Sequence, residues 1–283
     1  MLSRPVQAIW RVPRAKGPYL SYRRGSIFAE PTQRSSSGNF THASSSIVGK
    51  LLEEISWEKA RNYRKGGQGR ENVLTAEVLV GLDFLPRTEF LGSILRSAHG
   101  ALEARARVAA EAEELQMHFL PGDLRLGSGN YKGQPFVQPD AVFETPSTYT
   151  LVEAKRIRYG SFQPEQLARE YVALMSNAGA ARPVLLLLGV TPPVRVKGSG
   201  LLEIHDAVGR FLGPVLERTG DEALPSESEL LERIPEIFCW ISWEELKECI
   251  AQALEQHSAL HPSSEASVRR IAAFVHNAIA WHG

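Results

Sequence analysis

The chain of 283 residues contains only two cysteines, Cys239 and Cys249, and they do not form a C-x-x-C pair. This scarcity argues against a disulfide framework and a cysteine-rich zinc site, and it favours a reducing, cytoplasmic location. The sequence also has no run of about 18 apolar residues, so we expect no membrane-spanning helix and no membrane partner. Its longest apolar stretch, residues 183–190, has the length of a buried strand.

Short motifs of several enzyme classes are absent as well. The eight histidines are scattered along the chain, and none forms the H-E-x-x-H pattern of a zinc protease. There is no G-x-S-x-G sequence of a hydrolase nucleophile and no phosphate-binding P-loop. The Gly-rich residues 66–69 lack the Lys-Ser or Lys-Thr pair of such a loop. We interpret them as a linker whose basic neighbours could contact a phosphate backbone.

Charge is distributed unevenly, although the formal net charge is zero. Residues 1–45 contain seven Lys and Arg residues and one Glu, a local balance of +6, and they are rich in serine. Because this segment has no apolar periodicity, we expect a disordered basic arm. Three interpretations of the arm stay open: a phosphate-binding tail, an organellar transit peptide, or an extension without a role.

The pattern of residues 46–283 predicts one α/β domain. Helices are expected over residues 47–63, 71–82, 86–99, 102–116, 164–176, 201–216, 243–256 and 265–281. Strands are expected within 118–126 and over 136–144, 148–156, 183–190 and 237–241. The connection from Lys155 to Pro183 is long enough for a parallel crossover. These elements predict an αβα sandwich around a mixed sheet, with additional helices at both ends of the domain.

Two of these strands carry the candidate chemistry. Side chains alternate along a strand, so Glu153 and Lys155 are expected on one face while Val152 and Ala154 are buried on the other. Asp140 is expected to share its face with Gln138, with Val137, Ala141 and Phe143 buried on the opposite side. If the two strands pair as a hairpin, Asp140 meets Glu153 across the ladder, and two carboxylates and one ammonium gather at one point.

Such a grouping suits phosphodiester hydrolysis. Carboxylate oxygens are ligands for Mg²⁺ or Mn²⁺, and a bound metal can activate water and neutralise charge in the transition state. A lysine can position the water or stabilise developing charge. The plain structural alternative is a surface hairpin with a Glu–Lys ion pair. Glu245-Leu246-Lys247 repeats the triplet on a predicted amphipathic helix, and we interpret that copy as a solvated face.

These residues resemble the PD-(D/E)XK nuclease superfamily. The resemblance rests on Pro139-Asp140 and Glu153-Ala154-Lys155 on adjacent strands, and it spans residues 71–245. Gln166 and Tyr171 are similar to a Gln and a Tyr in the RecB-like branch, although there the Tyr lies one residue nearer to the Gln. The resemblance implies a restriction-endonuclease-like core, a Mg²⁺ or Mn²⁺ cofactor, and catalytic roles for Asp140, Glu153, Lys155 and Gln166.

A third acidic ligand is expected on the helix of residues 71–82. The segment that begins at Glu71 resembles the helix that brings an extra carboxylate to such sites, and we predict Glu71 rather than Glu77 as catalytic residue and metal ligand, beside Asp140 and Glu153. Glu71 shares a stripe with the apolar residues that face the sheet. Two alternatives stay open: Glu71 interacts only with the helix dipole, and Gln166 only caps its own helix.

The expected partner is a nucleic acid, with DNA favoured over RNA. Arg156, Arg158 and Arg169 follow the catalytic strand and are the candidates for nucleic-acid contact. The sequence therefore predicts a nuclease acting in DNA processing or bacterial anti-phage defence. A homodimer or a partner protein of a defence system is also possible. The rivals are a nuclease-fold subunit that only binds DNA or a partner protein, and an RNA-processing nuclease.

Overall fold

The computed structural model describes residues 69–127, 135–155, 160–258 and 261–282. Within these ranges no helix is both long enough and apolar enough to cross a membrane. The predicted basic arm of residues 1–45 and the predicted helix of residues 47–63 lie outside the described residues.

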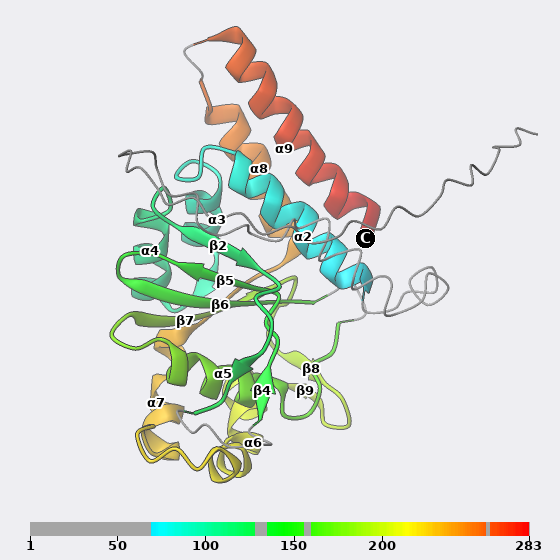
Figure 1. Cartoon of the computed structure of the whole chain (residues 1–283). Coiled ribbons are helices and arrows are strands. Elements are labelled where there is room, and N and C mark those ends of the chain that lie inside the picture. The colour runs from blue at the N-terminus through cyan, green and yellow to red at the C-terminus, as the bar shows by residue number, and fades with distance from the viewer. Residues whose placement is uncertain (1–68, 128–134, 156–159, 259–260, 283) are drawn as a thin grey trace, which may run out of the picture. The chain divides into compact units, whose positions relative to one another are not determined.

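A six-stranded mixed sheet organises the described chain (Figure 1). In spatial order its strands are β1 (His99–Gly100), β10 (Phe238–Ile241), β7 (Arg182–Leu188), β6 (Thr148–Ala154), β5 (Ala141–Glu144) and β2 (Gln116–Phe119). β6, β7 and β10 run parallel, whereas β1, β2 and β5 pair antiparallel with their neighbours. Two small two-stranded sheets accompany it, β3 (Leu124–Arg125) with β4 (Phe136–Val137), and β8 (Val194–Val196) with β9 (Gly200–Leu202).

Helices cover both faces of the large sheet (Figure 1). One face packs against α2 (Gly69–Phe84), α3 (Leu91–Ser97), α4 (Leu102–Ala110), α8 (Trp243–Gln256) and α9 (Pro262–His282). The other packs against α5 (Gln166–Asn177), α6 (Ile204–Thr219) and α7 (Glu227–Ile237). The prediction of an α/β fold with helices around a mixed sheet is confirmed at this level.

Alternation along β6 separates the two cores. Val152 and Ala154 are buried against the face that α2 and α8 cover, whereas Leu151 is buried against the α5 face. Because the side chains of a strand alternate, Glu153 and Lys155 share the α5 face with Leu151. Fully buried parallel strands with aliphatic side chains on both faces are expected when helices cover both sides of a sheet.

The two predicted connections around β6 are confirmed. β5 and β6 form an antiparallel hairpin, and the Thr145 N–H donates to the carbonyl of Thr148 across its turn at 3.0 Å. From the end of β6 the chain passes through α5 and returns as β7, which pairs parallel with β6. The capping box predicted for α8 is also present, because Ser242 and Glu245 bond each other's backbone N–H groups.

Other expectations were wrong in detail. The single strand predicted over residues 136–144 is divided into β4 and β5, and Gln138–Asp140 belong to neither strand. Pro139 has no N–H for the ladder, which favours a break there. Val137 consequently packs in the α5-side core, whereas Ala141 and Phe143 are buried on the opposite face as expected. The β8–β9 hairpin and α7 were not predicted.

Candidate active site

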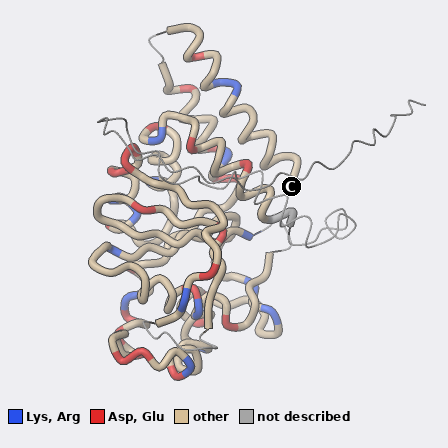
Figure 2. The backbone as a smooth tube through the Cα atoms, in the orientation of Figure 1, with Lys and Arg blue, Asp and Glu red and all other residues tan. Residues whose placement is uncertain are grey.

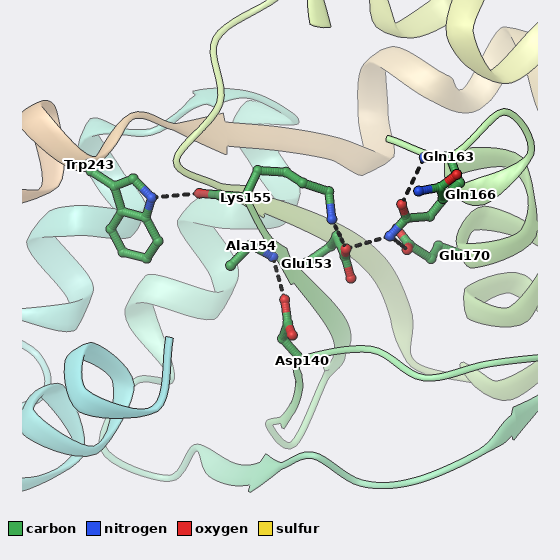
Figure 3. Close-up of polar contacts among 8 residues, drawn as sticks. All are labelled: Asp140, Glu153, Ala154, Lys155, Gln163, Gln166, Glu170 and Trp243. Carbon is green, nitrogen blue, oxygen red and sulfur yellow. Dashed lines mark hydrogen bonds and ion pairs between the residues drawn. The ribbon is translucent and has the colours of Figure 1, made fainter. Parts of the chain in front are cut away.

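A buried ion pair lies at the end of β6 that faces α5 (Figure 3). The Lys155 ammonium contacts Oε1 of Glu153, and the two side chains are only 6% and 7% exposed. Taking both charges out of water costs several kcal/mol per ion, so a buried pair of this kind needs close partners. An ion pair on a solvent-exposed hairpin, the plain alternative at these positions, does not fit this burial.

Asp140 lies where the register of the hairpin brings it beside Glu153. Ala141 is paired with Val152, so Asp140 follows on directly opposite Glu153. Its Oδ2 accepts a hydrogen bond from the Ala154 N–H at 2.7 Å (Figure 3). Its carbonyl accepts one from the Leu120 N–H at 2.9 Å. Leu120 has a left-handed backbone (φ 42°), a strained conformation for a leucine, at the end of β2. Asp140 is therefore held at two points although it is outside the ladder.

The backbone of Lys155 is fixed on both sides. Its N–H donates to the carbonyl of Leu188 at 2.8 Å, and its carbonyl accepts from the indole Nε1 of Trp243, the first residue of α8, at 2.7 Å. Gly189 makes this approach possible, because a Cβ there would lie 2.4 Å from the Lys155 oxygen. The ammonium also lies 4.9 Å from the centre of the Phe162 ring, within the range of a cation–π contact.

The structure places Gln166 next to Glu153, as predicted. The Gln166 Nε2 donates to Oε1 of Glu153 and, at 2.8 Å, to Oε1 of Glu170, while its own Oε1 accepts from the Gln163 N–H (Figure 3). Two acceptors on one side and a backbone donor on the other are satisfied by one orientation of the amide. Gln166 therefore bonds the first turn of its helix and the Glu153 carboxylate at once. Its part in catalysis stays a prediction.

Glu170 is a site residue that the sequence analysis missed. It is 3% exposed, and in the described part of the chain its Oε2 has no hydrogen-bond partner. Burial raises the pKa of this carboxyl well above its usual range, and the negative charge of Glu153 raises it further. The available signal was its position four residues after Gln166, which puts both side chains on one helix face. Together with Asp140, Glu153, Lys155 and Gln166 it forms what we call the carboxylate–lysine site.

Several predicted residues are not placed at this site. Glu71 lies in α2, but its side chain is outside the described residues, as are Arg156 and Arg158. Arg169 lies on α5, where its guanidinium donates to the Phe136 carbonyl of β4. Its role in nucleic-acid contact stays a prediction.

The two alternative site residues have other partners. Glu77 contacts the His282 Nε2 of α9 at 3.0 Å. The Tyr171 hydroxyl donates to the Leu230 carbonyl at 2.8 Å within the core, and so it serves the packing of α5 against α7.

The β8–β9 hairpin, which carries exposed cations, adjoins the site and was not predicted from the sequence. Strand β8 alternates between buried Val194 and Val196 and the exposed Arg195 and Lys197. The Phe162 N–H donates to the Arg195 carbonyl, and the Lys197 N–H donates to the Phe162 carbonyl, both at 2.9 Å. Phe162, whose ring lies under the Lys155 ammonium, therefore ties the hairpin to the site. Basic and acidic residues are otherwise intermixed along the described backbone (Figure 2).

The donor set of the site suits a hard divalent cation. The site combines the carboxyl groups of Asp140, Glu153 and Glu170 with one ammonium, and Oε2 of Glu170 is buried with no hydrogen-bond partner among the described residues. No described group of three or more His, Cys, Asp or Glu side chains is arranged to hold a metal ion by itself. Mg²⁺ is nonetheless commonly bound through one or two carboxylates, with water and substrate phosphate as further ligands. The residues present therefore fit such an ion.

No protein-family model, curated protein or solved structure matches this chain.

Proposed function

We propose that this protein is a metal-dependent nuclease of the PD-(D/E)XK type, which hydrolyses phosphodiester bonds in DNA with Mg²⁺ or Mn²⁺. The observation that supports the proposal most strongly is the burial of Glu153 and Lys155 beside Asp140 at the end of the hairpin. Because burying two charged groups costs free energy, such a pair is expected at a site where catalysis uses those charges. The mixed sheet with helices on both faces is compatible with the nuclease core.

Asp140 and Glu153 are the residues that would hold the cation. When bound, the ion would supply Lewis acidity and neutralise charge on the transferred phosphoryl group. Asp140 is held at its carbonyl and at Oδ2 by backbone N–H groups, which fixes its carboxylate beside Glu153. Glu153 accepts from Lys155 and Gln166 through Oε1, and these two donors fix the orientation of its carboxylate.

Lys155 and Gln166 would act on the substrate side of this pair. An ammonium fixed by its backbone and held over the Phe162 ring can stabilise negative charge that develops on the phosphoryl oxygens. Gln166 keeps the Glu153 carboxylate in one orientation, which removes a reorganisation step from binding. The Lys155 ammonium and the Gln166 amide could make both contributions from the positions that they occupy on the α5 face of the sheet.

The β8–β9 hairpin is the described surface that best suits the nucleic-acid backbone. Arg195 and Lys197 are both exposed, and hydrogen bonds to Phe162 tie their backbone to the site. Such cations position a substrate without reading its sequence. We keep Arg156, Arg158 and Arg169 as predicted contacts, and DNA processing or anti-phage defence in the cytoplasm as the proposed setting. In that setting the protein would act as a homodimer or together with a partner protein of a defence system.

The second candidate is a nuclease-fold subunit that binds DNA or a partner protein without cutting. It is favoured by the same hydrogen bonds, because Lys155 and Gln166 already occupy one oxygen of Glu153 and no described three-ligand metal group is preformed. An RNA-processing nuclease would use the same site, so the substrate must be determined directly.

The experiment is a substrate panel. The purified full chain is incubated with plasmid, linear and single-stranded DNA and with RNA, in Mg²⁺, Mn²⁺ or EDTA. We expect DNA cleavage that EDTA abolishes and that Asp140→Asn lowers by at least about 100-fold. Metal-dependent cutting of RNA alone would favour the RNA-processing nuclease. Binding without cutting of any substrate by the wild type would favour the silent subunit.

A further inference from the structure

Glu170 has properties that its place in a helix does not require. It lies on α5, where it is as buried as the apolar residues of that helix, and one of its two oxygens accepts from Gln166 at 2.8 Å. The other oxygen has no hydrogen-bond partner in the described chain. Burying a polar atom without a partner costs roughly 1–3 kcal/mol by mutational data, and a carboxylate costs more. A residue that served packing alone would be expected to be apolar here.

The carboxyl group points toward the site rather than into the core (Figure 3). The Nε2 of Gln166 bridges its Oε1 to Oε1 of Glu153, so the two carboxylates share one donor. The charges of Glu153, Lys155 and Asp140 all act on Glu170, which places the four groups in one electrostatic unit. Lys155 pairs with Glu153, whereas Oε2 of Glu170 has no hydrogen-bond partner in the described chain.

We propose that Glu170 is a further acidic residue of the divalent-cation site, and that its Oε2 receives the ion or one of the waters bound to it. This inference rests on the proposed function and adds a residue to it. A divalent ion, or a water bound to it, would supply the partner that the buried Oε2 lacks among the described residues. Gln166 would then link the two acids, because it bonds Glu153 of β6 and also Glu170, which lies one turn further along α5.

The test measures binding of Mn²⁺ alone, without substrate, to the full chain. Mn²⁺ affinity is determined by electron paramagnetic resonance of the free ion and by calorimetry, for the wild type and for Glu170→Gln. The amide of the variant keeps an oxygen that can accept from Gln166, while the negative charge is removed. We expect the affinity of Glu170→Gln to fall at least about tenfold. The matched control is Glu165→Gln, which changes an acid at the start of the same helix that pairs with Arg218, and it should bind Mn²⁺ as the wild type does.

Thermal unfolding in EDTA separates binding from folding. Because Glu170→Gln keeps the shape of the side chain and an oxygen that can accept from Gln166, its melting temperature in EDTA should not fall below that of the wild type. Saturating Mn²⁺ should raise the melting temperature of the wild type more than that of the variant. Equal Mn²⁺ affinities, or a variant that is unstable in EDTA yet binds Mn²⁺ normally, would show that Glu170 is structural.

Asp140→Asn distinguishes failure of this inference from failure of the proposed function. If Asp140→Asn weakens Mn²⁺ binding and Glu170→Gln does not, the cation site stands and only the role of Glu170 is overturned. If the wild type binds no Mn²⁺, or if Asp140→Asn binds it normally, both the cation site and the role of Glu170 are overturned.

Discussion

The same Glu-x-Lys triplet occurs twice in this chain with opposite physical outcomes. On β6, Glu153 and Lys155 project from one face and form a buried ion pair beside Asp140. On α8, Glu245 completes a capping box and bonds His99, while Lys247 pairs with Glu244 at the surface. Residues i and i+2 share a face on a strand but not on a helix. The triplet therefore forms a site only where strand geometry, burial and a neighbouring acid coincide.

The largest expected difference is in stability, between the variants that remove the lysine from one triplet or from the other. Lys155→Ala leaves the buried Glu153 carboxylate without its ion-pair partner, so the free energy of unfolding should fall by about 3–5 kcal/mol. Lys247→Ala breaks a surface pair and should lower it by at most about 1 kcal/mol. Urea unfolding at pH 7 in EDTA measures both changes. Similar losses in the free energy of unfolding for the two variants would show that the buried ion pair stabilises the fold no more than the surface pair does.

Trp243 connects the two regions, because it begins the helix of the second triplet and bonds the backbone of the first. Trp243→Phe removes the indole donor from the Lys155 carbonyl, and we expect a loss of about 1–3 kcal/mol together with reduced cleavage. The control is Trp240→Phe, which changes a partly buried indole that stacks on His99. A Trp243→Phe variant with wild-type stability and cleavage would contradict the anchoring role of this hydrogen bond.

The smallest effect is a dependence on pH at the surface triplet. The hydrogen bond with His99 lowers the pKa of Glu245 to about 2, from a usual value near 4.5. A carboxyl whose folded-state pKa is depressed stabilises the fold above its unfolded pKa, and the stabilisation is lost as pH falls through the folded value. Glu245→Gln keeps a capping side chain but not the charge, so it should be less stable than the wild type at pH 7. The difference should vanish between about pH 4.5 and pH 2, and thermal unfolding across that range measures it. A difference that is constant with pH would assign the effect to packing.

The local alternation of the chain made much of the fold and site predictable. Apolar Val152 and Ala154 between Glu153 and Lys155 define a strand with one charged face, and a Pro-Ser turn defines its hairpin partner. The position of Asp140 opposite Glu153 follows from that register. Pro139 was used as part of a motif, yet its missing N–H divides the preceding strand and moves Val137 to the other core. A proline inside a predicted strand indicates such a break from the sequence alone.

Residues that act across elements were harder to find. Whether Glu170 faces solvent or the sheet depends on how α5 packs, and the pattern of one helix does not determine that. Arg169 was expected to meet nucleic acid, but the carbonyl it bonds belongs to β4, a strand that the sequence analysis did not separate from β5. Arg195 and Lys197 belong to a short hairpin that the sequence analysis did not predict. Each of these residues takes its role from a tertiary neighbour.

Cleavage by the two lysine variants tests the central claim most directly. The full-length wild type, Lys155→Ala and Lys247→Ala are incubated with linear and plasmid DNA in Mg²⁺, below the melting temperature of the least stable protein. The account predicts that Lys247→Ala cuts at the wild-type rate and that Lys155→Ala loses at least about 100-fold while its circular dichroism spectrum remains that of a folded chain. Undiminished Mg²⁺-dependent cleavage by folded Lys155→Ala would contradict the assignment of this site.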